Sequence, residues 1–116
     1  MKIVYIAHPI GGDVEGNLKK IADIAQDINL NEQDVVPFTP YYLDCHCLTD
    51  SNPEERARGI KNDTALLKRG FVDEMRLYGS TISKGMYAEV LLARELNIRI
   101  VFMTTETEKS YFDIFH

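Results

Sequence analysis

Glu89 lies where the apolar face of an amphipathic helix is expected, and a carboxylate in such a place can serve as a nucleophile or an acid–base group. At about 100° per residue, a helix over residues 83–96 puts Glu89 on the same side as Met86 and Leu96. Other charged residues already occupy the polar side. Because an unpaired buried carboxylate costs several kcal/mol, Glu89 must face a cleft or a compensating partner.

Asp63 repeats this pattern on a second expected helix, residues 53–68. The helical projection places Asp63 between Ile60 and Leu67, away from the lysines of the same segment. Two inward carboxylates predict a paired site. The structural alternative is that Asp63 pairs with Arg56 two turns earlier and that Glu89 bonds to a neighbouring hydroxyl, since ion pairs of purely structural importance also perturb pKa values.

Composition restricts the class of protein. A chain of 116 residues, 45% hydrophobic and 27% charged, is expected to form a single domain over residues 1–116. The net charge of −5, without a basic block, argues against a nucleic acid polymer as partner, whereas a small nucleotide is compatible with it. No segment has the length of a membrane span or the pattern of a signal peptide, so we expect a cytoplasmic protein with no membrane partner.

The sequence Cys45-His46-Cys47 invites a metal interpretation. The two cysteines are too close in sequence for a good disulfide. A closed zinc site needs four ligands, and only His8 and His116 remain among the usual nitrogen and sulfur donors. We therefore expect a reduced cysteine pair in a loop, no metal, and no cofactor.

Strands and helices are expected to alternate along the chain. The expected strands cover residues 3–7, 35–38, 75–78 and 98–103. The expected helices cover residues 13–29, 53–68 and 83–96, the first of them capped by Asp13. This order predicts an α/β fold: a three-layer, doubly wound parallel sheet of the Rossmann-like or flavodoxin-like type, with four to five strands and helices on both faces.

Two parts of this pattern are irregular. Residues 39–52 form the longest non-periodic segment, and we expect a loop that walls or covers a ligand site. Its Tyr41 and Tyr42 can stack on a base or pack onto the sheet. Arg76 is unusual in a buried strand, and we expect it to face an edge of the sheet.

Ligands of doubly wound sheets bind beyond the carboxyl ends of the strands. The first strand is followed there by the substrate-binding candidates His8, Ile10, Gly11 and Gly12, in a glycine turn that opens a helix whose N–H groups can hold an anion. The third strand leads through Ser83 and Gly85 into the Glu89 helix. The positive end of that helix dipole favours an ionised Glu89.

The segment Ser83-x-Gly85-x-x-x-Glu89 resembles the nucleophile segment of the nucleoside 2-deoxyribosyltransferases and deoxynucleoside 5′-monophosphate N-glycosidases, and the resemblance covers most of the chain. Tyr5 matches the family tyrosine that hydrogen-bonds the nucleophile, and Asp63, in Asn62-Asp63-x-x-x-Leu67, matches the aspartate near the departing base. The segment Ile10-Gly11-Gly12 resembles the glycine-rich loop of the monophosphate-cleaving members.

The resemblance implies an enzyme that cleaves the N-glycosidic bond of a nucleoside 5′-monophosphate, or transfers its deoxyribosyl group, through a covalent glycosyl–Glu89 intermediate. Asp63 would protonate the leaving base, with its pKa raised by burial, while the helix terminus and Tyr5 would keep Glu89 charged. Ser83 favours a monophosphate, because family members that act on free nucleosides tend to carry Asp at this position; capping of the helix is its alternative role. A homodimer or higher homo-oligomer is implied as well.

Several features depart from the family pattern. His8-Pro9 replaces small residues, Gly70-Phe71 looks like an insertion that can shift Asp63, and the apolar tail 108–116 suits either a subunit interface or the chain's own surface. Two other functions compete with the enzyme proposed above. One is a catalytically silent nucleotide-binding module, and the other is a glycohydrolase of a larger nucleotide such as NAD, which would require the 39–52 segment to open. The base, the sugar, and the choice between hydrolysis and transfer stay open.

Overall fold

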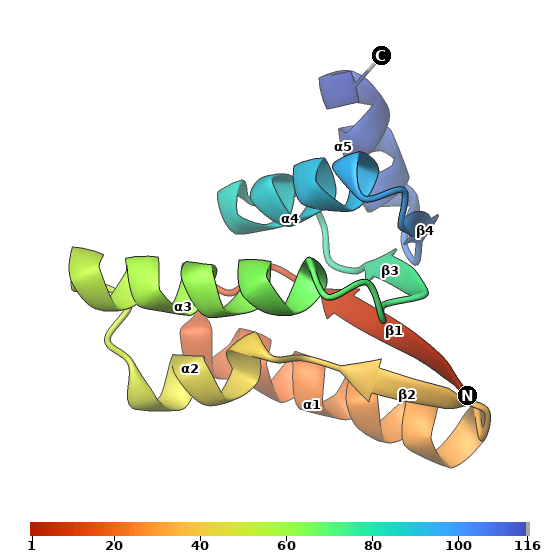
Figure 1. Cartoon of the computed structure of the whole chain (residues 1–116), viewed down its shortest axis with the longest axis horizontal. Helices are drawn as coiled ribbons and strands as arrows, with labels where there is room; N and C mark the ends of the chain where they lie inside the picture. The colour runs from red at the N-terminus through yellow and green to blue at the C-terminus, as the bar shows by residue number, and fades with distance from the viewer. Residues whose placement is uncertain (116) are drawn as a thin grey trace.

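Alternating strands and helices form one parallel sheet flanked by helices (Figure 1). The computed structural model describes residues 1–115. The strands are β1 (Lys2–Ala7), β2 (Val35–Phe38), β3 (Glu74–Leu77) and β4 (Arg99–Phe102). The helices are α1 (Val14–Asn31), α2 (Tyr41–Cys47), α3 (Pro53–Leu67), α4 (Lys84–Glu95) and α5 (Thr105–Phe115). All pairings are parallel, in the order β2-β1-β3-β4. The predicted α/β fold of the Rossmann-like or flavodoxin-like type is confirmed, with four strands.

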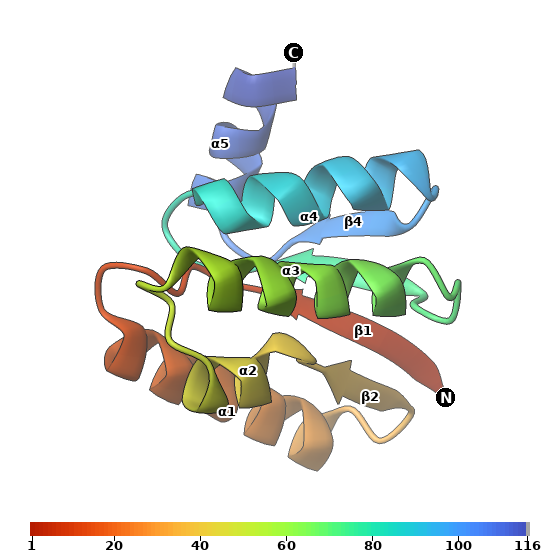
Figure 2. The same ribbon diagram turned by 60° about the vertical axis from the view of Figure 1, so that its left-hand side comes forward.

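The helices cover opposite faces of the sheet. Tyr5 on β1 reaches Glu89 on α4, whereas Arg76 on β3 reaches Glu32, which caps the C-terminus of α1. Tyr5 is in register with Met75, the residue before Arg76, and neighbouring residues of a strand point to opposite faces. Helix α1 therefore lies on one face and α4 on the other, with α3 beside α4 (Figure 2).

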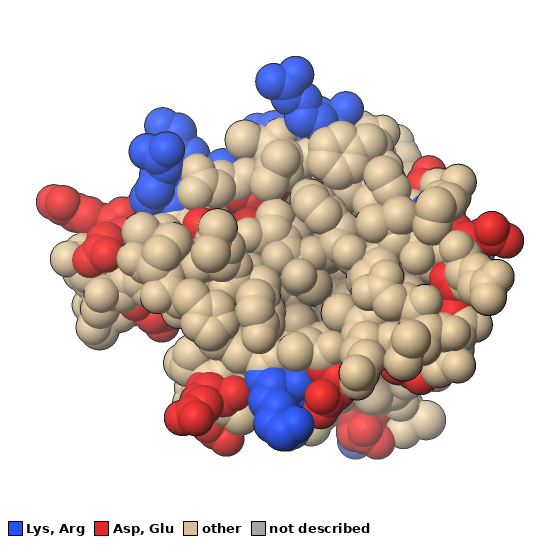
Figure 3. Space-filling model, turned by 90° about the horizontal axis from the view of Figure 1, so that it is seen from below, with Lys and Arg blue, Asp and Glu red and all other residues tan. Residues whose placement is uncertain are grey.

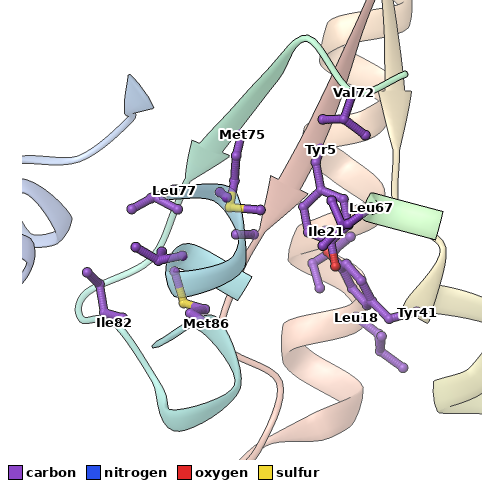
Figure 4. Close-up of a cluster of buried hydrophobic side chains, with 13 residues drawn as sticks. Tyr5, Leu18, Ile21, Tyr41, Leu67, Val72, Met75, Leu77, Ile82 and Met86 are labelled. Carbon is purple, nitrogen blue, oxygen red and sulfur yellow. The ribbon is translucent and has the colours of Figure 1, made fainter. Parts of the chain in front are cut away.

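The hydrophobic core on the α3–α4 side holds the sheet to these helices. Tyr5 and Met75 of the two central strands are fully buried there, together with Leu67 of α3 and Met86 of α4 (Figure 4). Burial of each such side chain contributes on the order of 2 kcal/mol. Because these residues come from four elements, the core fixes α3 and α4 relative to the carboxyl ends of β1 and β3.

The expectation of a loop over residues 39–52 was wrong, because this segment contains α2. Pro40 stands at the N-cap, and the Tyr42 N–H donates to the Thr39 carbonyl at 3.0 Å. Tyr41 is only 6% exposed and anchors the helix in the core. A helix of seven residues is too short to show a clear apolar period in the sequence.

Helix α5 was not predicted as a helix. It packs on the chain's own surface, which was one of the two alternatives for this tail: Arg94 of α4 donates to the Tyr111 hydroxyl at 2.9 Å and lies 4.4 Å from the centre of the Phe115 ring. Cation–π contacts of this kind are worth about 0.5–2 kcal/mol. His116, considered above as a metal ligand, lies outside the described residues.

The expectation that Arg76 faces a sheet edge was also wrong. Strand β3 lies between β1 and β4, and Arg76 is only 7% exposed. Its guanidinium donates to Glu74 at 2.7 Å and to both carboxylate oxygens of Glu32 at 2.9 Å, while Lys2 also contacts Glu74. The arginine is buried because two carboxylates compensate its charge.

Within residues 1–115, no helix has the length and apolar character needed to cross a membrane.

Candidate functional site

The hydroxyl group of Tyr5 donates a hydrogen bond to Oε2 of Glu89, which brings together two of the predicted site residues. Tyr5 is fully buried, and burial, followed by the Glu89 charge, raises the pKa of its hydroxyl well above the ordinary value. The hydroxyl therefore stays protonated at neutral pH and acts as the donor. This contact leaves Oε1 of Glu89 as the oxygen that can meet a reactant.

Asp63 on α3 has a buried oxygen without a protein partner. Among the buried side-chain oxygen atoms of residues 1–115, Oδ1 of Asp63 is the one that accepts no hydrogen bond. Asp63 also forms no ion pair with Arg56, so the alternative of a structural Asp63–Arg56 pair was wrong. Burial raises the pKa of Asp63 to about 7, and the nearby Asp44 adds to the shift. An orphaned acceptor of this kind is more costly than a satisfied one, which makes it a candidate contact for a ligand.

The surroundings of Glu89 oppose the ionised state that the sequence predicts for it. Desolvation raises its pKa to about 8, the Asp63 charge adds to the rise, and the Tyr5 hydrogen bond opposes it. Ser83 caps the helix and Lys84 begins it, so Glu89 lies in the second turn, where the dipole effect has already weakened. At neutral pH the two carboxyl groups therefore hold most of their protons between them, as carboxylates that repel each other in a shared site do.

Hydrogen bonds from side chains at the start of α1 hold the glycine turn after β1 in place. Asn17 donates to the Ile10 carbonyl at 3.0 Å and to the Gly11 carbonyl at 3.4 Å. Asp13 caps α1 by accepting from the Gly16 N–H at 3.1 Å, as expected. Gly12 has φ of +90°, a conformation that favours glycine, and the space beside Gly11 and Gly12 is open. The turn thus presents backbone to solvent at the carboxyl end of β1.

The loops after β1 and β3 touch each other. A Cβ atom added to Gly79 would lie 2.7 Å from Cδ of Pro9, and Gly79 has φ of +96°. Thr104 donates to the Gly79 carbonyl at 2.7 Å, and the Ile82 N–H donates to Ser110 of α5 at 3.1 Å. These contacts fix the β3 loop, which leads into α4, next to the β1 loop.

His8 follows β1 and is 7% exposed. Its Nδ1 lies 2.7 Å from the carbonyl oxygen of Pro9. A carbonyl oxygen can only accept, so Nδ1 carries a proton and donates it. Nothing in the structure brings His8 into contact with Glu89 or Asp63.

Ser83 and Gly85 occupy the first residues of the Glu89 helix. Ser83 Oγ accepts from the Met86 N–H at 3.3 Å, so the capping role is present. Accepting this bond leaves the hydroxyl proton of Ser83 free to donate elsewhere. Apart from its chain neighbours and the backbone of its own helix, no atom lies within 4 Å of a Cβ placed on Gly85, so the helix surface there is open to a close approach.

The two cysteines lie in helix α2 and not in the loop that the sequence predicts for them. Cys45 and Cys47 are free thiols, and within residues 1–115 no group of three or more His, Cys, Asp and Glu side chains can hold a metal ion. Burial raises the pKa of Cys45 to about 11, with Asp63 adding to the shift, which disfavours the thiolate form that metals require. His46 packs against the Tyr42 ring instead, with 5.0 Å between ring centres.

Two surface hollows lie elsewhere on the molecule. One is lined by residues of the α2–α3 connection, between Thr49 and Glu55, and the other lies between α1 and α2 and includes Leu18 and Tyr42. Neither is lined by Glu89 or Asp63. The candidate site is therefore defined by its side-chain geometry and by the two adjoining loops.

Comparison with known proteins shows the family. The chain belongs to the family described as "Domain of unknown function (DUF7768)", whose model matches residues 2–103. The match includes both carboxylates and both loops, and it ends before α5. A comparison with curated proteins found no match. The description of the family assigns no activity, so function must be argued from the site.

Proposed function

We propose that this protein cleaves the N-glycosidic bond of a nucleoside 5′-monophosphate, or transfers its deoxyribosyl group, with Glu89 as the nucleophile. The observation that carries the proposal is the hydrogen bond from Tyr5 to one oxygen of Glu89, in a neighbourhood shared with the unpartnered oxygen of Asp63. A carboxylate with one oxygen bound and the other free suits attack on an anomeric carbon.

The reaction would proceed in two steps. Oε1 of Glu89 attacks C1′ of the sugar, the C1′–N bond breaks, and its electron pair leaves with the base, which takes a proton from Asp63. In the second step a water molecule attacks C1′, the ester bond to Glu89 breaks, and the water proton returns to Asp63. If a second base attacks in place of water, the same intermediate gives transfer.

The reactive form carries one proton, on Asp63, with Glu89 ionised. The pKa values of about 7 for Asp63 and about 8 for Glu89 leave about one proton on the pair near neutral pH, and that proton lies more often on Glu89, so the reactive form is the minority arrangement. The Tyr5 hydrogen bond favours the reactive form, because it favours charge on Glu89. A bell-shaped dependence of kcat/KM on pH is therefore expected.

Ser83, Gly85 and the Gly11-Gly12 turn would hold the sugar phosphate. The Ser83 hydroxyl proton and the exposed backbone are donors, and the space beside these glycines is open. The Lys and Arg side chains form no continuous patch on the face that includes α1 and α2 (Figure 3), which favours a small nucleotide over a polymer. The reaction would take place in the cytoplasm, in a homodimer or higher homo-oligomer, with no cofactor.

The test is release of free base from a panel of ribo- and deoxyribonucleoside 5′-monophosphates. We expect release by the unaltered protein and a loss of at least about 1,000-fold in Glu89→Gln, which keeps the shape of the side chain but removes the nucleophile. Glu95→Gln, on the exposed side of the same helix, is the matched control and should release base normally. Mass spectrometry of a quenched reaction should detect the glycosyl–protein adduct.

Other outcomes separate the alternatives. Release that persists in Glu89→Gln would contradict the nucleophile assignment. Exchange between a nucleoside and a second base, without hydrolysis, would assign transfer. Binding of nucleotides without turnover of any monophosphate, free nucleoside or NAD would establish the silent binding module in place of the enzyme.

A further inference from the structure

Tyr41 lies at the start of α2, 6% exposed, beside the residue that holds Glu89. Its ring centre is 5.9 Å from that of Tyr5 (Figure 4). Phe38 packs on Tyr5 from β2, with 6.0 Å between ring centres. The Tyr5 ring is therefore confined by two aromatic neighbours. Base stacking by Tyr41, one of the two roles weighed for it, is excluded by this burial.

The Tyr41 hydroxyl replaces a missing sheet donor. The Ile3 and Ala7 carbonyls of β1 accept from backbone N–H groups on the β3 side, at Asp73 and Tyr78. Carbonyls alternate along a strand, so the Ile6 carbonyl points to the β2 side. Strand β2 ends at Phe38, two residues before a proline that has no N–H to offer.

Tyr41 supplies the bond that β2 cannot. Its hydroxyl donates to the Ile6 carbonyl at 2.6 Å, in a buried environment. A buried carbonyl left without a donor would cost about 1–3 kcal/mol, so this bond constrains the carboxyl end of β1, next to Tyr5. The hydroxyl proton is committed there, which means that Tyr41 has no proton to give to Glu89 or to a substrate.

We infer that Tyr41 is a positioning residue that holds the Tyr5 hydroxyl on Glu89, through the Ile6 carbonyl on one side and through ring contact on the other. The titratable groups that share this neighbourhood are Tyr5 on β1, Cys45 on α2, Asp63 on α3 and Glu89 on α4. Of these groups, Tyr5 is the one whose ring Tyr41 contacts, so any effect of Tyr41 on Glu89 is transmitted through Tyr5. The inference deepens the proposed function, and it rests on that function for its catalytic meaning.

The test measures the pKa of Glu89 in the free protein, by NMR of labelled glutamate carboxyl carbons assigned with Glu89→Gln. Because the Tyr5 bond lowers the pKa of Glu89, Tyr5→Phe should raise it by about 1, and Tyr41→Phe should raise it by about 0.5. The double variant should match Tyr5→Phe alone, since Tyr41 has nothing left to position. Tyr42→Phe, the neighbouring tyrosine, is the matched control and should change nothing.

An unchanged Glu89 pKa in folded Tyr41→Phe, or additive effects in the double variant, would overturn the inference. If Tyr41→Phe does not fold, 4-aminophenylalanine at this position keeps a weaker donor, and a smaller rise is expected; no rise would again overturn it. The measurement needs no turnover, so it stands even if no base is released. Where base is released, Tyr41→Phe should also lower kcat several-fold with little change in KM and move the acidic limb of the profile to higher pH.

Discussion

Tyr5 and Glu89 are hydrogen-bonded although 84 residues separate them in the chain. The sheet places Tyr5 on the central strand β1 with its side chain toward α4, and the apolar face of α4 turns Glu89 toward the sheet. No local sequence motif brings these two residues together. The contact is a product of the whole fold, and it determines which oxygen of Glu89 is free.

The two carboxyl groups predict an unusual dependence of stability on pH. Asp63 and Glu89 have raised pKa values in the folded protein, about 7 and about 8, so the folded state binds more protons than the unfolded state between about pH 4 and pH 8. Stability is therefore fully present at the low end of this window and is lost as the pH rises. Each unit of pKa difference corresponds to about 1.4 kcal/mol, so even after allowance for solvent screening we expect the unfolding free energy to fall by several kcal/mol from these groups.

Urea unfolding at pH 5 and pH 8 checks this expectation. The double variant Asp63→Asn with Glu89→Gln should lose most of the pH dependence and be the more stable protein at pH 8. Asp23→Asn, which neutralises an exposed carboxylate, serves as the control and should follow the unaltered protein. Equal slopes in the double variant and the unaltered protein would show that the pair is not desolvated.

The sequence was sufficient to predict most of the fold, because the apolar runs and amphipathic stretches that carry it are long enough to show their periods. All four strands and the helices α1, α3 and α4 lie within two residues of their expected bounds. Helix α2 was missed because its seven residues are too few to show a helical period. Helix α5 was missed because its apolar residues were interpreted only as an apolar C-terminal segment that packs on another surface.

The candidate site could be predicted only in part. The inward placement of Glu89 and Asp63 follows from helical projection, and the structure places Tyr5 on Glu89. The raised pKa of Glu89 could not be foreseen, because desolvation depends on neighbours from several elements. The role of Tyr41 was likewise hidden, since it depends on where β2 ends beside β1.

Arg76 predicts a large loss of stability when its charge is removed. Arg76→Met leaves Glu74, whose side chain is only 4% exposed, with two more exposed partners, Lys2 at 3.1 Å and Arg99 at 3.9 Å. Breaking one partner of a buried ion pair costs about 3–5 kcal/mol, and we expect a loss of this size in urea unfolding. Adding Glu74→Leu should recover most of it. Lys19→Met, which breaks an exposed pair with Asp23, should change stability by less than about 0.5 kcal/mol.

Ser83→Asp separates helix capping from phosphate binding. Aspartate caps helices as well as serine does, so the stability of the variant should stay within about 0.5 kcal/mol. Under the proposed function, a carboxylate about 4 Å from a phosphate charge costs on the order of 4 kcal/mol at an effective dielectric of 20. Binding of nucleoside 5′-monophosphates, measured by calorimetry, should therefore weaken by about 100-fold or more, while binding of free nucleosides should change little. Equal weakening for both ligands would argue against a phosphate at Ser83.

Gly85→Ala should move stability and activity in opposite directions. Gly85 lies in the first turn of α4 and has open space beside it, so alanine adds no clash and raises the unfolding free energy by about 0.5–1 kcal/mol. If the sugar phosphate approaches the helix there, the added methyl group must displace it, and KM for base release should rise by about 10-fold or more with the larger change in KM than in kcat. Thermal unfolding and steady-state kinetics on the same preparation give both values. A variant that gains stability and keeps its KM would place the ligand away from Gly85 and leave Glu89 to be reached from another side.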